Sequence, residues 1–204
     1  MKNAAAVVAV LGALAGCVSI PDVPPRDYYV LVDLAPPAAV TPAVAGGRVL
    51  LVNPASASPF YDTQHLVFSR VPGQRAYYQF AGWTERPGHR LNELLTRRLE
   101  AGGGFHSVAA TTAGVRGDLV LNTRLEEFYH DVAAKPGSVR IEVAAELVDF
   151  GKHAVVARRR FAQSAPTSGE NAQAAVSAFN QATTALLDEL AAWVGSAAAQ
   201  AAAR

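Results

Sequence analysis

The chain has 204 residues, and its 18 basic and 17 acidic side chains give a formal net charge of +1 at pH 7. This nearly neutral charge argues against a nucleic-acid-binding surface, which normally needs a clustered basic face. The single cysteine excludes a disulfide framework within the chain, and a chain of this length can bury enough core to fold without one.

The first 17 residues have the three features of a bacterial lipoprotein signal. Lys2 is the only charged residue before Cys17, a short apolar run follows it, and the run ends in the box LAGC at residues 14–17. The run is too short to span a bilayer as a helix, whereas its length and flanks suit a secretory signal peptide. We predict that residues 1–16 are a signal peptide, cleaved between Gly16 and Cys17. The alternative is a free cysteine buried in an N-terminal helix.

The predicted lipid anchor has consequences for charge and location. Cys17 would carry an S-diacylglycerol and an N-acyl chain, and several acyl chains together anchor a protein stably. Loss of Lys2 leaves a mature chain with equal numbers of acidic and basic side chains. Val18 follows the lipidated residue, and by resemblance to enterobacterial lipoproteins the absence of aspartate there implies the outer membrane. The proline-rich residues 17–27 are predicted to form a flexible, lipidated tether.

Several short β-favouring runs follow the tether, separated by proline and glycine. Pro72 and Gly73 lie between two of them, which suits a type II turn and predicts a β-hairpin. The apolar alternation slips at Glu126–Glu127, which predicts a β-bulge before Phe128. The predicted strands cover residues 28–34, 48–54, 65–70, 75–80, 105–110, 118–130, 138–150 and 153–164.

Two segments have helical periodicity. The first begins at Pro87, and its leucines recur at positions 91, 94, 95 and 99 before the sequence AGGG ends it. The second covers residues 170–195, with an apolar stripe along one side and Ser168 or Thr167 as its N-cap. The alanine-rich tail, residues 196–204, is expected to fray or be disordered. These elements predict one α/β domain over residues 28–195, in which two helices pack on a mixed β-sheet.

The patterns that carry catalysis or bind metals are missing. The five histidines, at positions 65, 89, 106, 130 and 153, are never spaced four apart, so surface or turn histidines are favoured over a zinc site. Ser168 has no general base assigned to it and is better explained as a cap. Glu126 and Glu127 are neighbours that point to opposite faces of a regular strand, unless the bulge reorients them. We predict a protein that is not an enzyme, with no metal and no cofactor beyond the lipid on Cys17.

Two surface features are candidates for interaction. Alternation along a strand separates Arg159 from Arg158 and Arg160, which favours an ordinary solvated strand, although the run could meet an acidic protein patch or lipid headgroups. Four aromatic residues fall within seven positions near the hairpin, at 77, 78, 80 and 83. Most are expected in the core, and Tyr78 or Trp83 is the residue expected to reach a surface and form an interface.

Several short stretches together resemble one family. The sequences YYVL, FYDTQHLVFSR, YYQFAGW, LEEFYHD and AFNQATTALLDELAAWV follow the lipobox cysteine in that order. The mature chain thereby resembles the ABC-type transport auxiliary lipoproteins, which include the lipoprotein partner of the paraquat-inducible transport proteins. The sequence GWTERPG departs from the family pattern, because Pro87 comes so early in the helix.

The resemblance implies a three-layer α/β fold and no catalytic residues. It also implies an outer-membrane lipoprotein that faces the periplasm and docks an MCE-domain (mammalian cell entry) protein and its ABC transporter, a system that moves lipids between the membranes. Homo-oligomerisation is compatible with such a partner. The alternatives are a structural lipoprotein of another envelope assembly of the Tol type, a lipid-binding carrier, and, last, a hydrolase.

Overall fold

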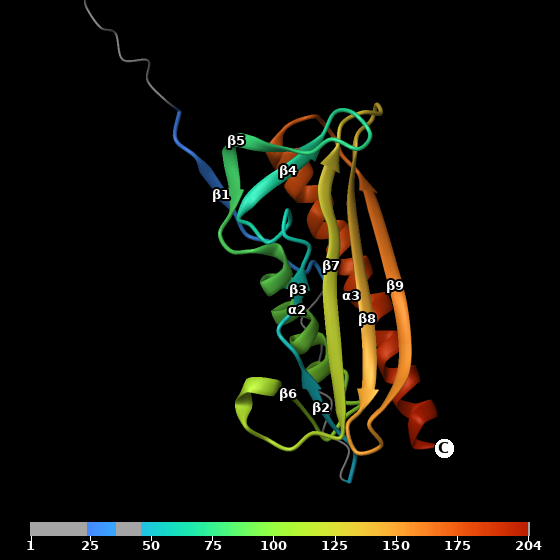
Figure 1. The fold of residues 1–204 in the computed structure, drawn as a ribbon. Coiled ribbons are helices and arrows are strands. Elements are labelled where there is room, and N and C mark those ends of the chain that lie inside the picture. The colour runs from blue at the N-terminus through green and yellow to red at the C-terminus, as the bar shows by residue number, and fades with distance from the viewer. Residues whose placement is uncertain (1–23, 36–45, 204) are drawn as a thin grey trace, which may run out of the picture.

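The computed structural model describes residues 24–35 and 46–203. The predicted signal peptide, Cys17 and most of the tether lie outside these ranges. The described part contains a curled β-sheet and two long helices (Figure 1). The helices are α2 (Pro87–Ala101) and α3 (Ala172–Ala202), and η1 (Thr111–Ala113) is a single 3₁₀ turn. The strands are β1 (Asp27–Tyr29), β2 (Val49–Val52), β3 (Ser56–Ala57), β4 (His65–Ser69), β5 (Ala76–Trp83), β6 (Ser107–Ala110), β7 (Leu119–Asp131), β8 (Ser138–Asp149) and β9 (Ala154–Pro166).

Strand β7 organises the sheet. One of its edges pairs antiparallel with β8, which pairs antiparallel with β9. The other edge pairs in parallel with β2, β3 and β4, which follow one another along its length. Beyond these, β6 lies parallel to β2, while β5 is antiparallel to β4 and carries β1 at its far edge. The predicted mixed sheet and the predicted β4–β5 hairpin are therefore confirmed.

The predicted bulge in β7 is also present. Leu125 pairs with Val143 of β8, but the next paired residue is Glu127, opposite Glu142. Glu126 is the extra residue, so the alternation resumes one position later and Phe128 points into the core. The bulge lets the long strand keep its apolar side chains on one face although the sequence periodicity slips.

Both helices lie on the same face of the sheet. This inner face of β8 presents Val139, Ile141, Val143, Ala145 and Leu147, all of them buried. Leucine side chains of α2 and of α3 meet there against Leu125 and Val143. The predicted α/β class, a mixed sheet packed by two main helices, is therefore confirmed. The outer face of β7–β9 carries charged side chains such as Arg124, Arg158 and Arg160, which are exposed.

Helix α2 begins at Pro87, as predicted. Proline is tolerated at the first helical position because the amide that it lacks would have no partner within the helix. Arg86 before it has an extended backbone, with φ of −62° and ψ of 129°. The early proline that departs from the family pattern is therefore compatible with the start of this helix.

Helix α3 differs from the prediction at both ends. Its N-cap is Asn171, whose Oδ1 accepts a hydrogen bond of 2.8 Å from the amide of Ala174, and neither Ser168 nor Thr167 takes that role. At the other end the helix continues to Ala202, so the expected fraying of the alanine-rich tail is wrong. Alanine has the highest helix propensity, and the small side chains of Ala197 and Ala198 are buried. No helix within the described ranges combines the length and hydropathy needed to cross a membrane.

The first predicted strand is shorter than expected, because β1 ends at Tyr29. After it the chain leaves the sheet and passes over the helices. The amide of Val32 donates to Oδ1 of Asn180 at 3.1 Å, and the amide of Leu34 donates to Oγ1 of Thr184 at 2.8 Å. Side-chain oxygens of α3 thus accept the hydrogen bonds of these backbone amides, a role that the carbonyl groups of a neighbouring strand would otherwise have.

Candidate functional site

The structure places Trp83 in the core. Only 1% of its surface is exposed. Its ring meets Phe128 of β7 and Phe179 of α3 edge to face, at centroid distances of 5.7 and 5.4 Å. This arrangement joins the hairpin to the main sheet and to the long helix. Trp83 is therefore a packing residue, and the expectation that it reaches a surface is corrected.

Tyr78 is half-buried and is hydrogen-bonded within the protein. Its hydroxyl lies 2.8 Å from Nδ1 of His130, and Nε2 of His130 lies 3.3 Å from the hydroxyl of Thr167. Burial raises the pKa of Tyr78 to about 12, and burial lowers the pKa of His130. The three side chains connect β5, β7 and the segment before α3, so they hold elements together. The aromatic residues of this hairpin that do reach the surface are Tyr77 and Phe80.

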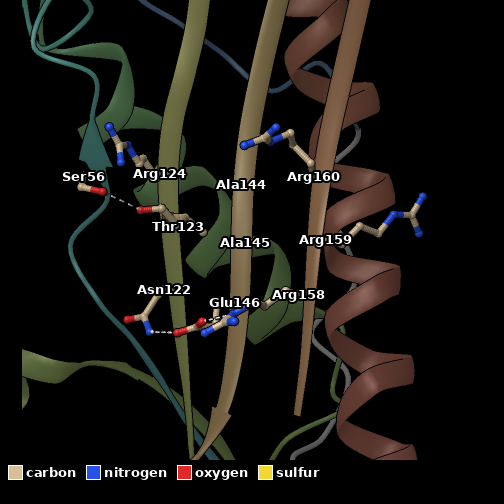
Figure 2. Close-up of a pocket in the computed structure, with 10 residues that line it drawn as sticks. All are labelled: Ser56, Asn122, Thr123, Arg124, Ala144, Ala145, Glu146, Arg158, Arg159 and Arg160. Atoms are coloured by element: carbon tan, nitrogen blue, oxygen red, sulfur yellow. Dashed lines mark hydrogen bonds and ion pairs between the residues drawn. The ribbon is translucent and has the colours of Figure 1, made fainter. Parts of the chain in front are cut away.

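A shallow groove of about 510 Å³ lies on the outer face of β7–β9 (Figure 2). Two cross-strand rows form it. In the first row Ala144 lies between Arg124 and Arg160, and in the second Glu146 lies beside Arg158. Because the methyl group of Ala144 is much shorter than the flanking arginines, the first row is hollow at its centre. We call this feature the arginine groove.

The arginines of this region differ in their partners. Arg158 is paired with Glu146, and Nε of Arg160 lies 2.7 Å from Oε2 of Glu126. Arg159 points to the helical side and pairs with Glu189 of α3, which confirms that alternation separates it from its neighbours. The exposed guanidinium of Arg124 forms no ion pair with any residue of the described ranges. It can therefore bind a carboxylate or a phosphate without breaking an existing pair.

The two glutamates at the bulge also belong to this charge network. Glu126 is paired with Arg160, and Oε1 of Glu127 lies 3.3 Å from the guanidinium of Arg75. Both carboxylates are thus held by arginines instead of facing each other. The structure gives them no geometry for acid–base catalysis.

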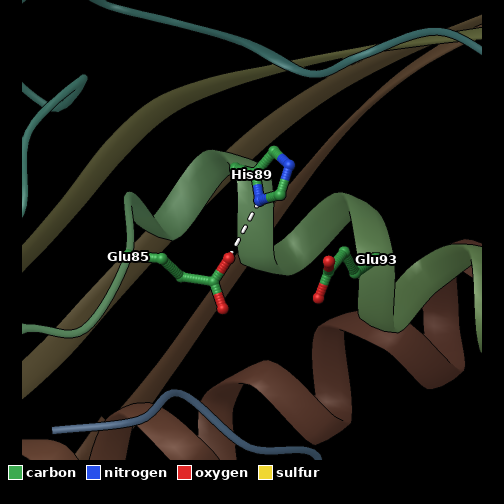
Figure 3. A group of neighbouring side chains, drawn as sticks. All are labelled: Glu85, His89 and Glu93. Atoms are coloured by element: carbon green, nitrogen blue, oxygen red, sulfur yellow. Dashed lines mark hydrogen bonds and ion pairs between the residues drawn. The ribbon is translucent and has the colours of Figure 1, made fainter.

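One group of three potential metal ligands is found among the described residues: Glu85, His89 and Glu93, at the start of α2 (Figure 3). Their ligand atoms lie within 4.8 Å of one another, and Nδ1 of His89 is 2.9 Å from Glu85. Arg90 lies 2.8 Å from Glu93 and 3.8 Å from Glu85. Because this guanidinium already pairs with both carboxylates, the group is a partly exposed ion-pair network. A search for paired histidines misses it, since two of its members are glutamates.

The fold is that of an α/β domain. Its candidate functional sites are exposed surfaces. The sequence matches the ABC-type transport auxiliary lipoprotein component family over residues 29–191. Because this match covers most of the chain, the protein belongs to that family. A search of the curated proteins finds no match.

Solved structures share this fold. Protein XCC0632 from Xanthomonas campestris is 27% identical, with a TM-score of 0.79 over 88% of this chain and 100% of that one. An uncharacterised protein at 14% identity has a TM-score of 0.63 over 84% of this chain and 99% of its own. The hypothetical protein CT253 from Chlamydia trachomatis is 11% identical, with a TM-score of 0.51 over 74% and 98%. The last two are similar in fold alone.

Proposed function

We propose that this protein is a non-catalytic, outer-membrane-anchored lipoprotein that docks the periplasmic end of an MCE-type lipid transport system. The observation that carries the proposal is the family match over residues 29–191, which identifies an auxiliary component of ABC-type transport. The MCE partner follows from the resemblance of the sequence to the lipoproteins of such systems. In this role the protein supplies a fixed surface at the membrane and performs no chemistry.

The lipid anchor would keep the domain close to the membrane. Cys17 precedes the first strand residue, Asp27, by ten positions. A fully extended chain of that length spans at most about 35 Å. The start of the domain must therefore lie within about 35 Å of the lipid headgroups, which suits a partner that spans the periplasm and ends at the outer membrane.

The arginine groove is the surface that best fits a docking role. It is exposed, it lies on paired strands, and it offers to an acidic group of a partner the guanidinium of Arg124, which has no ion pair within the described part of the chain. The ion pairs of Arg158 and Arg160 hold the remaining side chains of the rows in place. A partner carrying a carboxylate at the matching position would gain a charge-assisted hydrogen bond.

A lipid-carrier function has less support. The apolar space between the two helices and the sheet has a volume of only about 20 Å³ in the described part. Sites for small-molecule ligands typically have volumes of about 300–1,000 Å³. The domain would have to separate its helices from the sheet to hold an acyl chain, so docking explains the structure better than carriage.

Crosslinking pull-downs from intact cells test the proposal. Wild type should recover an MCE-domain protein, and Cys17→Ala should recover less because the anchor is lost. Arg124→Glu should weaken recovery about tenfold, since a like charge replaces the attractive one. Arg97→Glu makes the same charge change at an exposed position on α2 and should have no effect. Recovery of Tol-type or cell-wall components in place of an MCE protein would contradict the proposal, and a crosslinked dimer or ring would reveal homo-oligomerisation.

A further inference from the structure

Three aromatic side chains, one histidine and one arginine contact one another along a surface near the end of the tether. The guanidinium of Arg26 lies 5.8 Å from the ring centroid of Tyr28 and is hydrogen-bonded to Nδ1 of His65. The His65 ring lies 4.7 Å from Tyr77, which stacks on Phe60 at 4.9 Å with an interplanar angle of 10°. We call these five residues the tether-root face.

Strand pairing explains why these residues share one face. Tyr28 of β1 is opposite Gly82 of β5, and Gly82 is opposite His65 of β4, so the three positions form one row. Gly82 has no side chain, and a Cβ there would lie 3.4 Å from Nε of Arg26. The arginine can therefore lie across the row between the two rings. The next residue of β5, Trp83, points to the opposite side and enters the core.

The face is accessible and amphipathic. Tyr28, Tyr77 and Phe60 are 57%, 42% and 39% exposed. A polar hollow of about 250 Å³ opens beside them between Arg26 and Arg86. Tyrosine and arginine combine an apolar body with a polar end, a composition that favours the boundary between lipid headgroups and acyl chains.

Chain connectivity brings this face to the membrane. Arg26 follows Cys17 by nine residues, a span of at most about 32 Å when fully extended. Every part of the domain farther along the chain has a longer path back to the lipid. The tether-root face is thus an exposed aromatic surface that the covalent anchor holds near a bilayer.

We propose that the tether-root face contacts the headgroup layer of the phospholipid membrane in which the Cys17 lipid is inserted, and thereby fixes the orientation of the domain. The inference rests on the lipid anchor of the proposed function. The aromatic rings enter the interface, Arg26 and Arg86 meet headgroup phosphates, and the domain stands in one orientation instead of rotating freely on its tether. The hollow beside Arg26 has room for a headgroup.

Lipid-borne quenchers test this contact. The mature lipoprotein is reconstituted into vesicles of phosphatidylethanolamine and phosphatidylglycerol that contain nitroxide-labelled lipid. Because acylation blocks Cys17, the thiol introduced by Gln64→Cys is the only reactive one and takes a single fluorophore at the edge of the hollow. Ala185→Cys places the same label on an exposed position of α3. We expect the label at residue 64 to be quenched about threefold more, since interfacial side chains lie at headgroup depth.

A pair of serine variants tests the aromatic contribution. In the Gln64→Cys protein, Tyr28→Ser should reduce quenching about twofold, because one of the exposed rings no longer enters the interface. Val115→Ser removes an exposed apolar side chain elsewhere and should leave quenching unchanged. Circular dichroism verifies that both variants are folded.

Flotation of the vesicles separates the possible failures. A protein that does not float with the vesicles contradicts the lipid anchor of the proposed function. A protein that floats but is quenched equally at residues 64 and 185 contradicts the membrane-contact inference alone. A label at residue 64 that is protected from an aqueous quencher, yet not reached by lipid nitroxides, would show that protein covers the face, and this also overturns the inference.

Discussion

Asp33 and Arg98 form a two-point ion pair that fastens the chain after β1 to helix α2. Nε and Nη2 of Arg98 lie 2.5 and 2.8 Å from the two carboxylate oxygens of Asp33. Arg98 also pairs with Asp188 of α3. Although burial acts to raise the pKa of Asp33, hydrogen bonds from Arg98 and from the Ala35 amide lower it below its usual value. One guanidinium thus joins three segments of the chain.

Replacement of this arginine should destabilise the domain. Arg98→Ala leaves the half-buried Asp33 carboxylate without its charged partner, and we expect a loss of about 2 kcal/mol in the free energy of unfolding. Urea denaturation measures it. Arg97→Ala removes a neighbouring exposed arginine on the same helix and should change stability by less than about 0.5 kcal/mol. Equal losses for the two variants would contradict the role of the ion pair.

Buried His130 should make stability depend on pH. Burial lowers the pKa of His130, against the opposing influence of Asp131 and Glu170. The unfolded chain therefore takes up the proton more readily than the folded one, and stability should decrease as the pH falls below about 6.5. Urea midpoints at a series of pH values measure this. His130→Asn should flatten the dependence in this window, whereas the same change at exposed His89 should preserve it.

Gly137 is a position where an added methyl group should disrupt packing. Its Cβ would lie 2.8 Å from the carbonyl oxygen of Asp131 and 3.1 Å from Nε2 of His130. We expect Gly137→Ala to reduce the free energy of unfolding by about 2 kcal/mol, because backbone must move to admit it. Gly104→Ala meets no atom within 4 Å and is the control. An unchanged urea midpoint for Gly137→Ala would contradict the close contact.

Gly195 is a position where an added methyl group should stabilise the protein. It lies inside α3, and an added Cβ would meet no atom within 4 Å. Alanine is favoured over glycine in a helix interior by about 1 kcal/mol. Gly195→Ala should therefore raise the thermal unfolding midpoint by several degrees. A lower midpoint would contradict the continuation of α3 through this position.

The main elements of the fold follow from local patterns. Strand β8 alternates between buried positions such as Val139 and charged ones such as Arg140, so both the strand and its inner face can be predicted. The break in the apolar alternation at Glu126 likewise allows the bulge in β7 to be predicted. The extension of α3 past Gly195 was missed because alanine gives no apolar stripe that distinguishes a packed helix from a frayed one.

The candidate surfaces could not be predicted so completely, because strand pairing between distant segments creates them. Tyr77 and Trp83 are six positions apart and would share a face in a regular strand. The pairing of β5 with β4 changes register between His65 and Val67, and the two rings lie on opposite sides. The arginine groove forms because strand pairing places Ala144 of β8 between Arg124 of β7 and Arg160 of β9. Amino-acid composition does not reveal this arrangement.

The parallel pairing of β2 with β7 has a consequence for the order of folding. Leu50 is opposite Leu119, which is made 69 residues later. The other parallel partner of β2, Val108 of β6, also lies far along the chain, so both pairings close long loops and are expected to form late in folding. Until one of these partners is in place, the apolar sequence VLLV has no neighbouring strand, so the unfolded chain is exposed to aggregation at this segment.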